Sequence, residues 1–418
     1  MNLFRKGSIG RKIPGYYDFI LATLLFLSFL ALPVSADELF CGIDRLEESE
    51  CRELSGLKVG LITNAAGVSR KGEANYAIML RSGVRLKFLM APEHGFSADL
   101  EAGKKVGSAV VADTLPVFSL YGASKIPDIR QLTQIDLLVF DLQDIGTRCY
   151  TYISTMKNAM EACEEAGIAF MVLDRPNPIA PLLPAGFMLE PGHESFVGAV
   201  DIPFIHSMTV GEIALLLKDR CYHKLDLRVI PMQGYRRERF ADEYPGFTFR
   251  APSPNIKTVD TAIIYPATVF LEATTVSEGR GTDNPFMQFG APFIKSRELA
   301  DAFKGYNLPG VSFEPVVFKP RSNKFDGKLC HGLKLSLTDR KAFNPFMTAT
   351  ALLLELQRLY PDKIGLDKRG EFFDKLAGNS LFREMIKKQF PLEKIMEESR
   401  RQVVQFKRSN HSRLTLYQ

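Results

Sequence analysis

The stretch Ile135 to Arg148 reads IDLLVFDLQDIGTR, an apolar run followed at once by a polar cluster. The same order recurs at three other places, where residues 57–63 precede Asn64, residues 84–91 precede Pro92-Glu93-His94-Gly95-Phe96, and residues 168–173 precede Asp174-Arg175-Pro176-Asn177. Buried parallel strands are short apolar runs, and ligands bind outside their carboxyl ends. The four polar clusters therefore predict one pocket at one edge of a parallel sheet.

The first half of the chain alternates such runs with helical patterns, as βαβ units do. We expect strands near residues 57–63, 84–91, 115–120, 135–141 and 168–174, and the clearest helix from about Tyr152 to Ala166. Thr209 and Glu212 form a capping box that opens another helix. This pattern predicts an α/β fold with a doubly wound parallel sheet.

The composition changes after Gln233, where proline and glycine become frequent. Strand-like runs follow at residues 311–318 and 332–337, and helical patterns continue from about Pro345 to the end. We interpret residues 37–235 as the sheet domain and residues 236–418 as a smaller α+β domain.

The N-terminus resembles an export signal. Basic residues come first, then an apolar stretch from Phe19 to Leu32, then Pro33-Val34-Ser35-Ala36. We predict a signal peptide over residues 1–36, cleavage after Ala36, and a periplasmic or secreted protein. An uncleaved leader would instead anchor the protein, and would be its one contact with a membrane.

Charge and cysteine content exclude some functions. The formal charge of the 418 residues is +5, and the leader carries most of it, so the remainder is close to neutral. Nucleic acid is therefore not an expected partner, because phosphate backbones require a strongly basic face. No CxxC pair occurs among the six cysteines, while Cys41 and Cys51 form either one local bridge or two buried free thiols.

Two chemistries fit the polar clusters poorly. Glu93 stands where a dinucleotide-binding domain keeps its ribose-binding acid, but the first strand is followed by Asn64-Ala65-Ala66-Gly67-Val68 and not by the glycine fingerprint. Metal-assisted hydrolysis would use His94, Asp141, Asp144 and His206, yet the histidines show no metal-ligand spacing. We therefore expect neither a cofactor nor a metal.

Glycoside hydrolysis fits better, because it needs a protonated carboxyl group beside the leaving oxygen and usually a second acid. Glu93 follows an apolar strand and precedes Phe96, and apolar surroundings favour a neutral carboxyl group. The candidates for the second acid are Asp141, Asp144, Asp174 and Glu272. Helix capping or a structural ion pair would explain the aspartates equally well.

Several segments together resemble one known family, the exo-β-N-acetylmuramidases of bacterial cell-wall recycling, formerly a domain of unknown function. The resemblance rests on the motif around Glu93, on Asp141-Leu142-Gln143-Asp144-Ile145-Gly146-Thr147-Arg148-Cys149-Tyr150-Thr151-Tyr152, and on Leu173-Asp174-Arg175-Pro176-Asn177-Pro178, Pro252-Ser253-Pro254-Asn255 and Gly279-Arg280-Gly281-Thr282. It runs in order from about Leu54 to the C-terminus. The motif after Glu93 continues with Ser97-Ala98 where the family usually has Arg-Gly.

The resemblance implies a Rossmann-like catalytic domain without a nucleotide, a smaller auxiliary domain and a cleft between them. It also implies that Glu93 is the catalytic acid and that terminal N-acetylmuramic acid of peptidoglycan fragments, muropeptides or the MurNAc-GlcNAc disaccharide is the substrate. Asp141 and Asp144 are our candidates to orient or to act as the second carboxyl. The residues expected to bind substrate are Asn64, His94, Gln143, Arg148, Tyr150, Asp174, Arg175, Asn177, Asn255, Glu272, Glu278 and Arg280.

Among these residues, Arg148, Arg175 and Arg280 are candidates for the lactyl carboxylate of muramic acid, since a guanidinium matches a carboxylate bidentately. Two other functions remain open. One is a non-catalytic protein that binds cell-wall glycans, and the other is a glycosidase of the same family with altered sugar specificity.

Overall fold

The structure, a computed structural model, describes residues 38–410 and 416–417, apart from 105–106, 108, 112–113 and 123. The expected signal peptide lies outside the described residues. From Leu39 onward the chain forms one compact unit. Within the described residues no helix has the length and apolarity that crossing a membrane requires.

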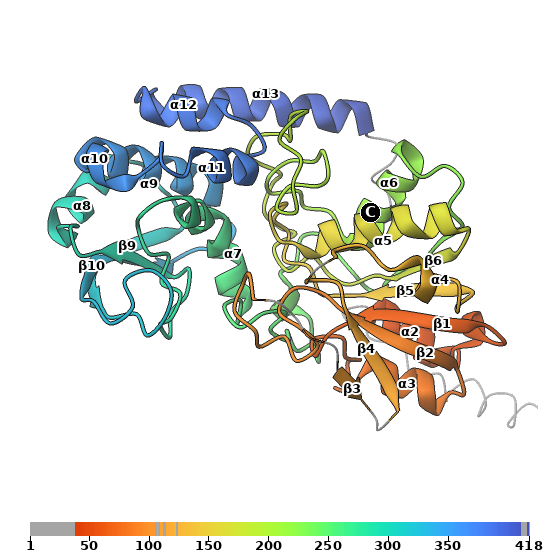
Figure 1. Cartoon of the computed structure of the whole chain (residues 1–418). Helices are drawn as coiled ribbons and strands as arrows, with labels where there is room; N and C mark the ends of the chain where they lie inside the picture. The colour runs from red at the N-terminus through yellow and green to blue at the C-terminus, as the bar shows by residue number, and fades with distance from the viewer. Residues whose placement is uncertain are drawn as a thin grey trace, which may run out of the picture. The chain divides into compact units, whose positions relative to one another are not determined.

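A seven-stranded sheet organises the first part of this unit (Figure 1). Its strands are β1 (Lys58–Thr63), β2 (Arg85–Ala91), β3 (Ala109–Val111), β4 (Leu115–Ser119), β5 (Leu137–Asp141), β6 (Ala169–Leu173) and β7 (Leu227–Ile230). The order is β3-β4-β2-β1-β5-β6-β7, and only β3 pairs antiparallel. The parallel strands thus follow the Rossmann order, whose switch point lies between β1 and β5.

The central strands β1, β5 and β6 are buried on both faces, as their apolar sequences predict. The helices of this part are α2 (Gly42–Glu48), α3 (Asn75–Arg81), α4 (Ile129–Leu132), α5 (Tyr152–Ala166) and α6 (Val210–Arg220), with a 3-10 turn η1 (Arg52–Leu54). On β5, Phe140 packs in the core with α5 and α6, and Val139 packs in the core with α2 and α3. Figure 1 shows these helix pairs on opposite faces.

A second sheet, antiparallel and ordered β8-β10-β9, belongs to the later part of the chain. Its strands are β8 (Gln288–Ala291), β9 (Val311–Phe318) and β10 (Cys330–Leu337). The helices and 3-10 turns around it are η2 (Ala241–Glu243), α7 (Val259–Thr268), η3 (Val269–Ala273), α8 (Ser296–Phe303), α9 (Pro345–Leu359), α10 (Pro361–Ile364), α11 (Gly370–Ala377), α12 (Leu381–Lys387) and α13 (Leu392–Asn410). The predicted strands, the 152–166 helix and the capping box are confirmed.

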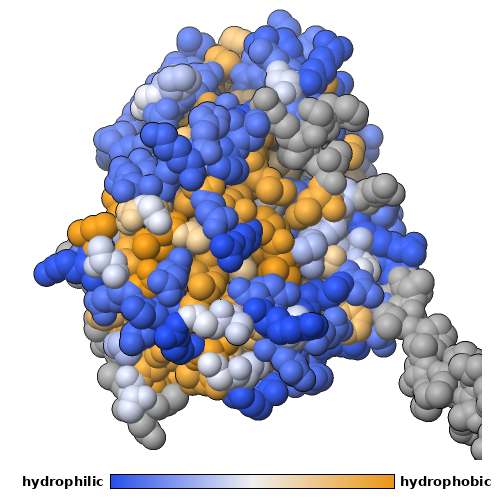
Figure 2. All heavy atoms as spheres, turned by 90° about the vertical axis from the view of Figure 1, so that its right-hand side faces the viewer, coloured by the Kyte–Doolittle hydropathy of each residue, from blue (hydrophilic) through white to orange (hydrophobic). Residues whose placement is uncertain are grey.

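One apolar core joins the two parts, because the cluster under α5 and α6 continues to Leu333 of β10 and Leu352 of α9. The division at residue 235 stays a prediction. Figure 2 shows an apolar area among polar side chains on one face. More than half of a typical protein surface is apolar, so this area alone does not identify a site.

Candidate active site

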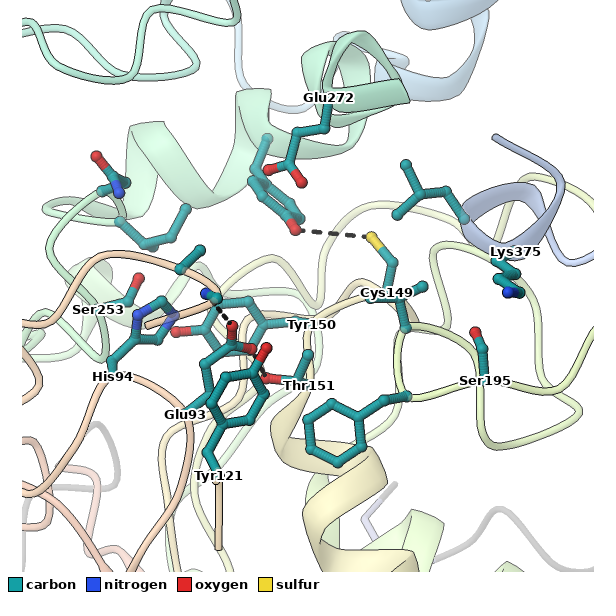
Figure 3. A pocket seen from close by; sticks show the side chains of 18 of the residues that line it. Glu93, His94, Tyr121, Cys149, Tyr150, Thr151, Ser195, Ser253, Glu272 and Lys375 are labelled. Carbon is teal, nitrogen blue, oxygen red and sulfur yellow. Dashed lines mark hydrogen bonds between the residues drawn. The ribbon is translucent and has the colours of Figure 1, made fainter. Parts of the chain in front are cut away.

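A pocket of about 430 Å³ lies where loops of the large sheet meet α7, η3 and α11 (Figure 3). Six residues that the sequence analysis singled out line it: Glu93, His94, Tyr150, Asn255, Glu272 and Arg280. Thr151, Tyr121, Lys125, Cys149, Ser253, Tyr265 and Lys375 also line it. Figure 3 shows Glu93, His94, Tyr121, Tyr150 and Thr151 gathered together, with Glu272 on another wall.

Glu93 is held by two hydrogen bonds at the carboxyl end of β2. Its Oε2 accepts from Thr151 Oγ1 at 2.7 Å, and its Oε1 accepts from the backbone N–H of Gly103 at 3.0 Å. Thr151 is the N-cap residue of α5, but its side chain makes no capping bond. The start of α5 therefore fixes the position of Glu93, which is 6% exposed on the pocket wall.

His94 has a left-handed backbone, with φ of 74°. A residue other than glycine rarely adopts this conformation, and strain of this kind concentrates at functional sites. Its Nδ1 lies 2.7 Å from the carbonyl oxygen of Leu100. Because a carbonyl oxygen only accepts, Nδ1 carries the proton. Burial lowers the pKa of His94 against the opposing effect of Glu93, so the neutral ring presents the lone pair of Nε2.

Aromatic side chains form much of the remaining wall. The rings of Tyr150 and Tyr152 meet edge to face with centroids 4.8 Å apart, and Tyr121 packs on Phe196 at 5.6 Å. Burial, together with the charge of Glu93, raises the pKa of Tyr121 to about 12. Lys125 Nζ lies 4.2 Å from the Phe196 ring centroid. Such rings and hydroxyls suit the mixed apolar and polar faces of a sugar.

A buried ion network faces Glu93 from the second part of the chain. Arg280 Nη2 donates to Glu272 at 2.6 Å, and Arg280 Nε lies 3.4 Å from Glu278. Lys324 Nζ donates to Glu278 at 3.0 Å and to the carbonyl oxygen of Leu271 at 2.7 Å. Burial opposes the charge of Arg280, but Glu272 and Glu278 raise its pKa overall. Within the described residues, Nη1 of Arg280 is buried and has no hydrogen-bond partner.

Arg148 does not reach this pocket. Its guanidinium, 1% exposed, donates to the carbonyl oxygens of Phe187 at 2.8 Å, Ile202 at 2.9 Å and Ala377 at 2.6 Å. Burial lowers its pKa to about 10. Arg148 therefore holds the C-terminal end of α11 and does not line this pocket.

Asp141 and Arg175 form a buried ion pair beside the carboxyl ends of β5 and β6. Arg175 Nε and Nη2 donate to the two carboxylate oxygens of Asp141 at 2.5 and 2.9 Å, and Asn75 donates to the same carboxylate at 2.7 Å. Asp141 is fully buried. Asp141 thus forms a buried ion pair with Arg175, and its catalytic role stays a prediction.

The remaining predicted residues also have partners outside the pocket. Asp144 accepts from the Gly146 N–H at 2.7 Å and lies 3.4 Å from His206 Nε2. Asp174 accepts from Thr209 and from the Gly211 N–H, and so holds the start of α6. The other side-chain bonds run from Gln143 to the Pro176 carbonyl, from Asn177 to the Met208 carbonyl and from Asn64 to the Tyr152 hydroxyl.

Cys41 and Cys51 lie outside this pocket, whose lining includes Cys149. Cys41 and Cys51 are buried free thiols, so the alternative of a local bridge is wrong for this structure. Within the described ranges no group of three or more His, Cys, Asp or Glu side chains is placed to hold a metal ion.

Two family models and one named relative match this chain over most of its length. Residues 59–260 match the family model described as exo-beta-N-acetylmuramidase NamZ, N-terminal, and residues 263–417 match its C-terminal counterpart. Peptidoglycan beta-N-acetylmuramidase NamZ of Bacillus subtilis (strain 168) is 42% identical over 370 residues, which cover 88% of this chain and 89% of that protein.

Two crystal structures share the fold, both of DUF1343 family proteins from Bacteroides fragilis NCTC 9343. One is 33% identical with a TM-score of 0.83, covering 91% of this chain and 100% of the other. The second is 28% identical with a TM-score of 0.73, covering 91% and 99%. The Rossmann-like α/β fold with a small antiparallel sheet is thereby confirmed. By its sequence along nearly the whole described length, the chain belongs to the exo-β-N-acetylmuramidase NamZ family.

Proposed function

We propose that this protein is an exo-acting glycoside hydrolase that releases N-acetylmuramic acid from the non-reducing end of peptidoglycan fragments. Membership of the family carries this proposal, since a relative 42% identical is named a peptidoglycan beta-N-acetylmuramidase. The pocket supports it, because a cavity of about 430 Å³ lies within the size range of small-molecule sites and has a buried glutamate in its wall.

In this proposal Glu93 is the general acid. The hydrogen bonds from Thr151 and Gly103 hold its carboxyl group in one orientation. The carboxyl group is therefore already oriented for proton transfer to the glycosidic oxygen when the substrate binds. Glu272 is the acid on another wall of the same pocket, and we assign it the second carboxyl role in place of Asp141 and Asp144. His94 offers Nε2 as a hydrogen-bond acceptor for a substrate hydroxyl or for water.

The test is hydrolysis of a MurNAc-GlcNAc disaccharide by the purified protein. We expect equal amounts of free MurNAc and GlcNAc by mass spectrometry, and no cleavage of a GlcNAc-GlcNAc control. Saturable binding of the disaccharide without turnover would favour the glycan-binding protein. Cleavage of the control at the same rate would favour altered sugar specificity.

We assign the binding of the lactyl carboxylate to Arg280, which lines the pocket. Because Nη1 has no partner in the pocket wall, a carboxylate there gains a charge-assisted hydrogen bond. We expect Arg280→Lys to raise KM for the MurNAc disaccharide ~10- to 100-fold, since a compact ammonium cannot reproduce the guanidinium fork.

The matched control is Arg321→Lys, an exposed arginine paired with Asp283, which should leave KM unchanged. A loss of kcat with constant KM in Arg280→Lys would instead place Arg280 in the chemical step.

We further propose that the mature chain begins at Asp37 and acts outside the cytoplasm, where its substrate lies. The basic start, the apolar stretch and Ala36 support this proposal. Mass spectrometry of the exported protein should find Asp37 as the first residue. A chain that retains residues before Phe19 would be anchored by its leader.

A further inference from the structure

A second cavity, of about 230 Å³, lies in the same compact unit between the loop after β1 and the segment before Pro252. It shares no lining residue with the pocket of Glu93. Its lining includes the loop residues that follow β1, Gln143 after β5 and Arg175 after β6. The cavity therefore lies at the switch point of the sheet, where Rossmann-like folds bind the phosphates of their ligands.

The charged side chains that line this cavity are basic. Arg70, Lys71, Arg175 and Arg250 line it, and within the described residues its lining contains neither aspartate nor glutamate. Asp141 neutralises Arg175, and Lys71 contacts Glu47 at 3.1 Å. Asp44 lies close by, accepting from the backbone N–H of Arg70 at 2.7 Å. Arg70 has a partner as well, so binding of an anion depends on Arg250, the remaining basic side chain of the lining.

Two arginines reach across the cavity from opposite loops. A Cβ placed on Gly72 would lie 3.5 Å from Arg250 Nη2, and one placed on Gly246 would lie 3.5 Å from Arg70 Nη2. The guanidinium of Arg250 thus lies beside the loop that carries Arg70, and the guanidinium of Arg70 lies beside the loop that carries Arg250. Arg250 is exposed, and the described part of the chain offers it no hydrogen bond or ion pair.

A buried hydroxyl in the lining has no hydrogen-bond partner within the part of the chain that the structure describes. It belongs to Ser69, a residue of the lining that is 4% exposed. Buried polar side chains are almost always hydrogen bonded, so an exception needs an explanation. A ligand that brings an oxygen atom to Ser69 would supply the missing partner.

We propose that this cavity is a second ligand site that binds a phosphate group, either as inorganic phosphate or as a phosphate monoester. Arginine guanidinium groups bind phosphate oxygens bidentately, and Ser69 donates the additional hydrogen bond. The loop after β1 lacks the glycine-rich sequence that brings backbone N–H groups to a pyrophosphate, so arginine side chains take over that contact. This proposal is independent of the hydrolase activity, because the two cavities have separate linings.

Isothermal titration of the full chain at constant ionic strength tests the proposal. Inorganic phosphate and glycerol phosphate are the two phosphate probes, and acetate is the carboxylate control. We expect saturable binding of at least one phosphate probe, weakened about 10-fold or more by Arg250→Ala and several-fold by Ser69→Ala. Arg85→Ala, an exposed arginine at the start of β2, is the matched control and should bind as the unaltered chain does.

A further experiment determines which of the two cavities binds the phosphate. Saturating MurNAc and the Arg280→Lys variant should both leave phosphate binding unchanged, because they concern the other pocket. The proposal is overturned if neither phosphate probe saturates, if acetate binds as well as phosphate, or if Arg250→Ala and Ser69→Ala bind normally. Competition by MurNAc would place the bound phosphate in the pocket of Glu93 and would also contradict it.

Discussion

Replacing Glu93 with glutamine is expected to lower kcat on the MurNAc-GlcNAc disaccharide by ~10²- to 10⁴-fold. The amide keeps the shape of the side chain and can still accept from Thr151 Oγ1, which lies 2.7 Å from the carboxylate. It has no acidic proton to deliver to the leaving oxygen. Initial rates from product quantification give kcat and KM for both proteins.

Binding should survive this change, because Arg280, Tyr150 and Asn255 still line the pocket. A titration of disaccharide into Glu93→Gln should therefore give an affinity close to that of the unaltered chain. Glu314→Gln, at an exposed position of β9, is the control for a glutamate outside the pocket. Normal turnover in Glu93→Gln would remove Glu93 from the chemistry and make Glu272 the acid to test.

Asp141→Asn is expected to lower the free energy of unfolding by ~3–5 kcal/mol, because it leaves the buried charge of Arg175 without its partner. Denaturant unfolding measures this loss. At denaturant concentrations well below the unfolding transition, kcat should be nearly unchanged. The reason is that Asp141 contacts Arg175 and Asn75 and does not line the pocket.

The control for Asp141 is Asp226→Asn, which breaks an exposed pair with Arg228 and should cost less than ~1 kcal/mol. If Asp141→Asn keeps full stability but loses turnover, the aspartate takes part in catalysis after all. The two measurements thus separate a structural role from a chemical one.

Sequence reasoning located the sheet well, because its signals are local. Each buried strand is a short apolar run, and the residue after the run is fixed at the carboxyl edge of the sheet. Glu93 follows β2 by this rule and does line the pocket. The same rule selected Asp141, the last residue of β5, and Arg175, two residues after β6, but these side chains bond to each other. Position at a strand end therefore does not decide whether a side chain faces the ligand or a neighbour.

Non-local contacts explain the other differences. Arg148 stands in the most characteristic motif, yet its partners are carbonyl groups of residues 187, 202 and 377, far away in the sequence. No pattern around Arg148 indicates that these segments converge there. Tyr121 and Lys375 reach the pocket from other parts of the fold in the same way.

Thr151 is a different case, because it stands in the motif from Asp141 to Tyr152 but is not among the site residues that the sequence predicts. In the structure its hydroxyl bonds to Glu93 instead of the helix backbone. The specific motif around it was the signal that could have identified it.

The most direct test of Glu93 as the general acid compares two substrates that differ only in the leaving group. One is the natural disaccharide, and the other is a chromogenic N-acetylmuramide whose leaving group needs little protonation. For Glu93→Gln we predict a large loss of kcat on the disaccharide and a much smaller loss on the chromogenic substrate. Equal losses on both substrates would contradict the proposed role of Glu93 as proton donor.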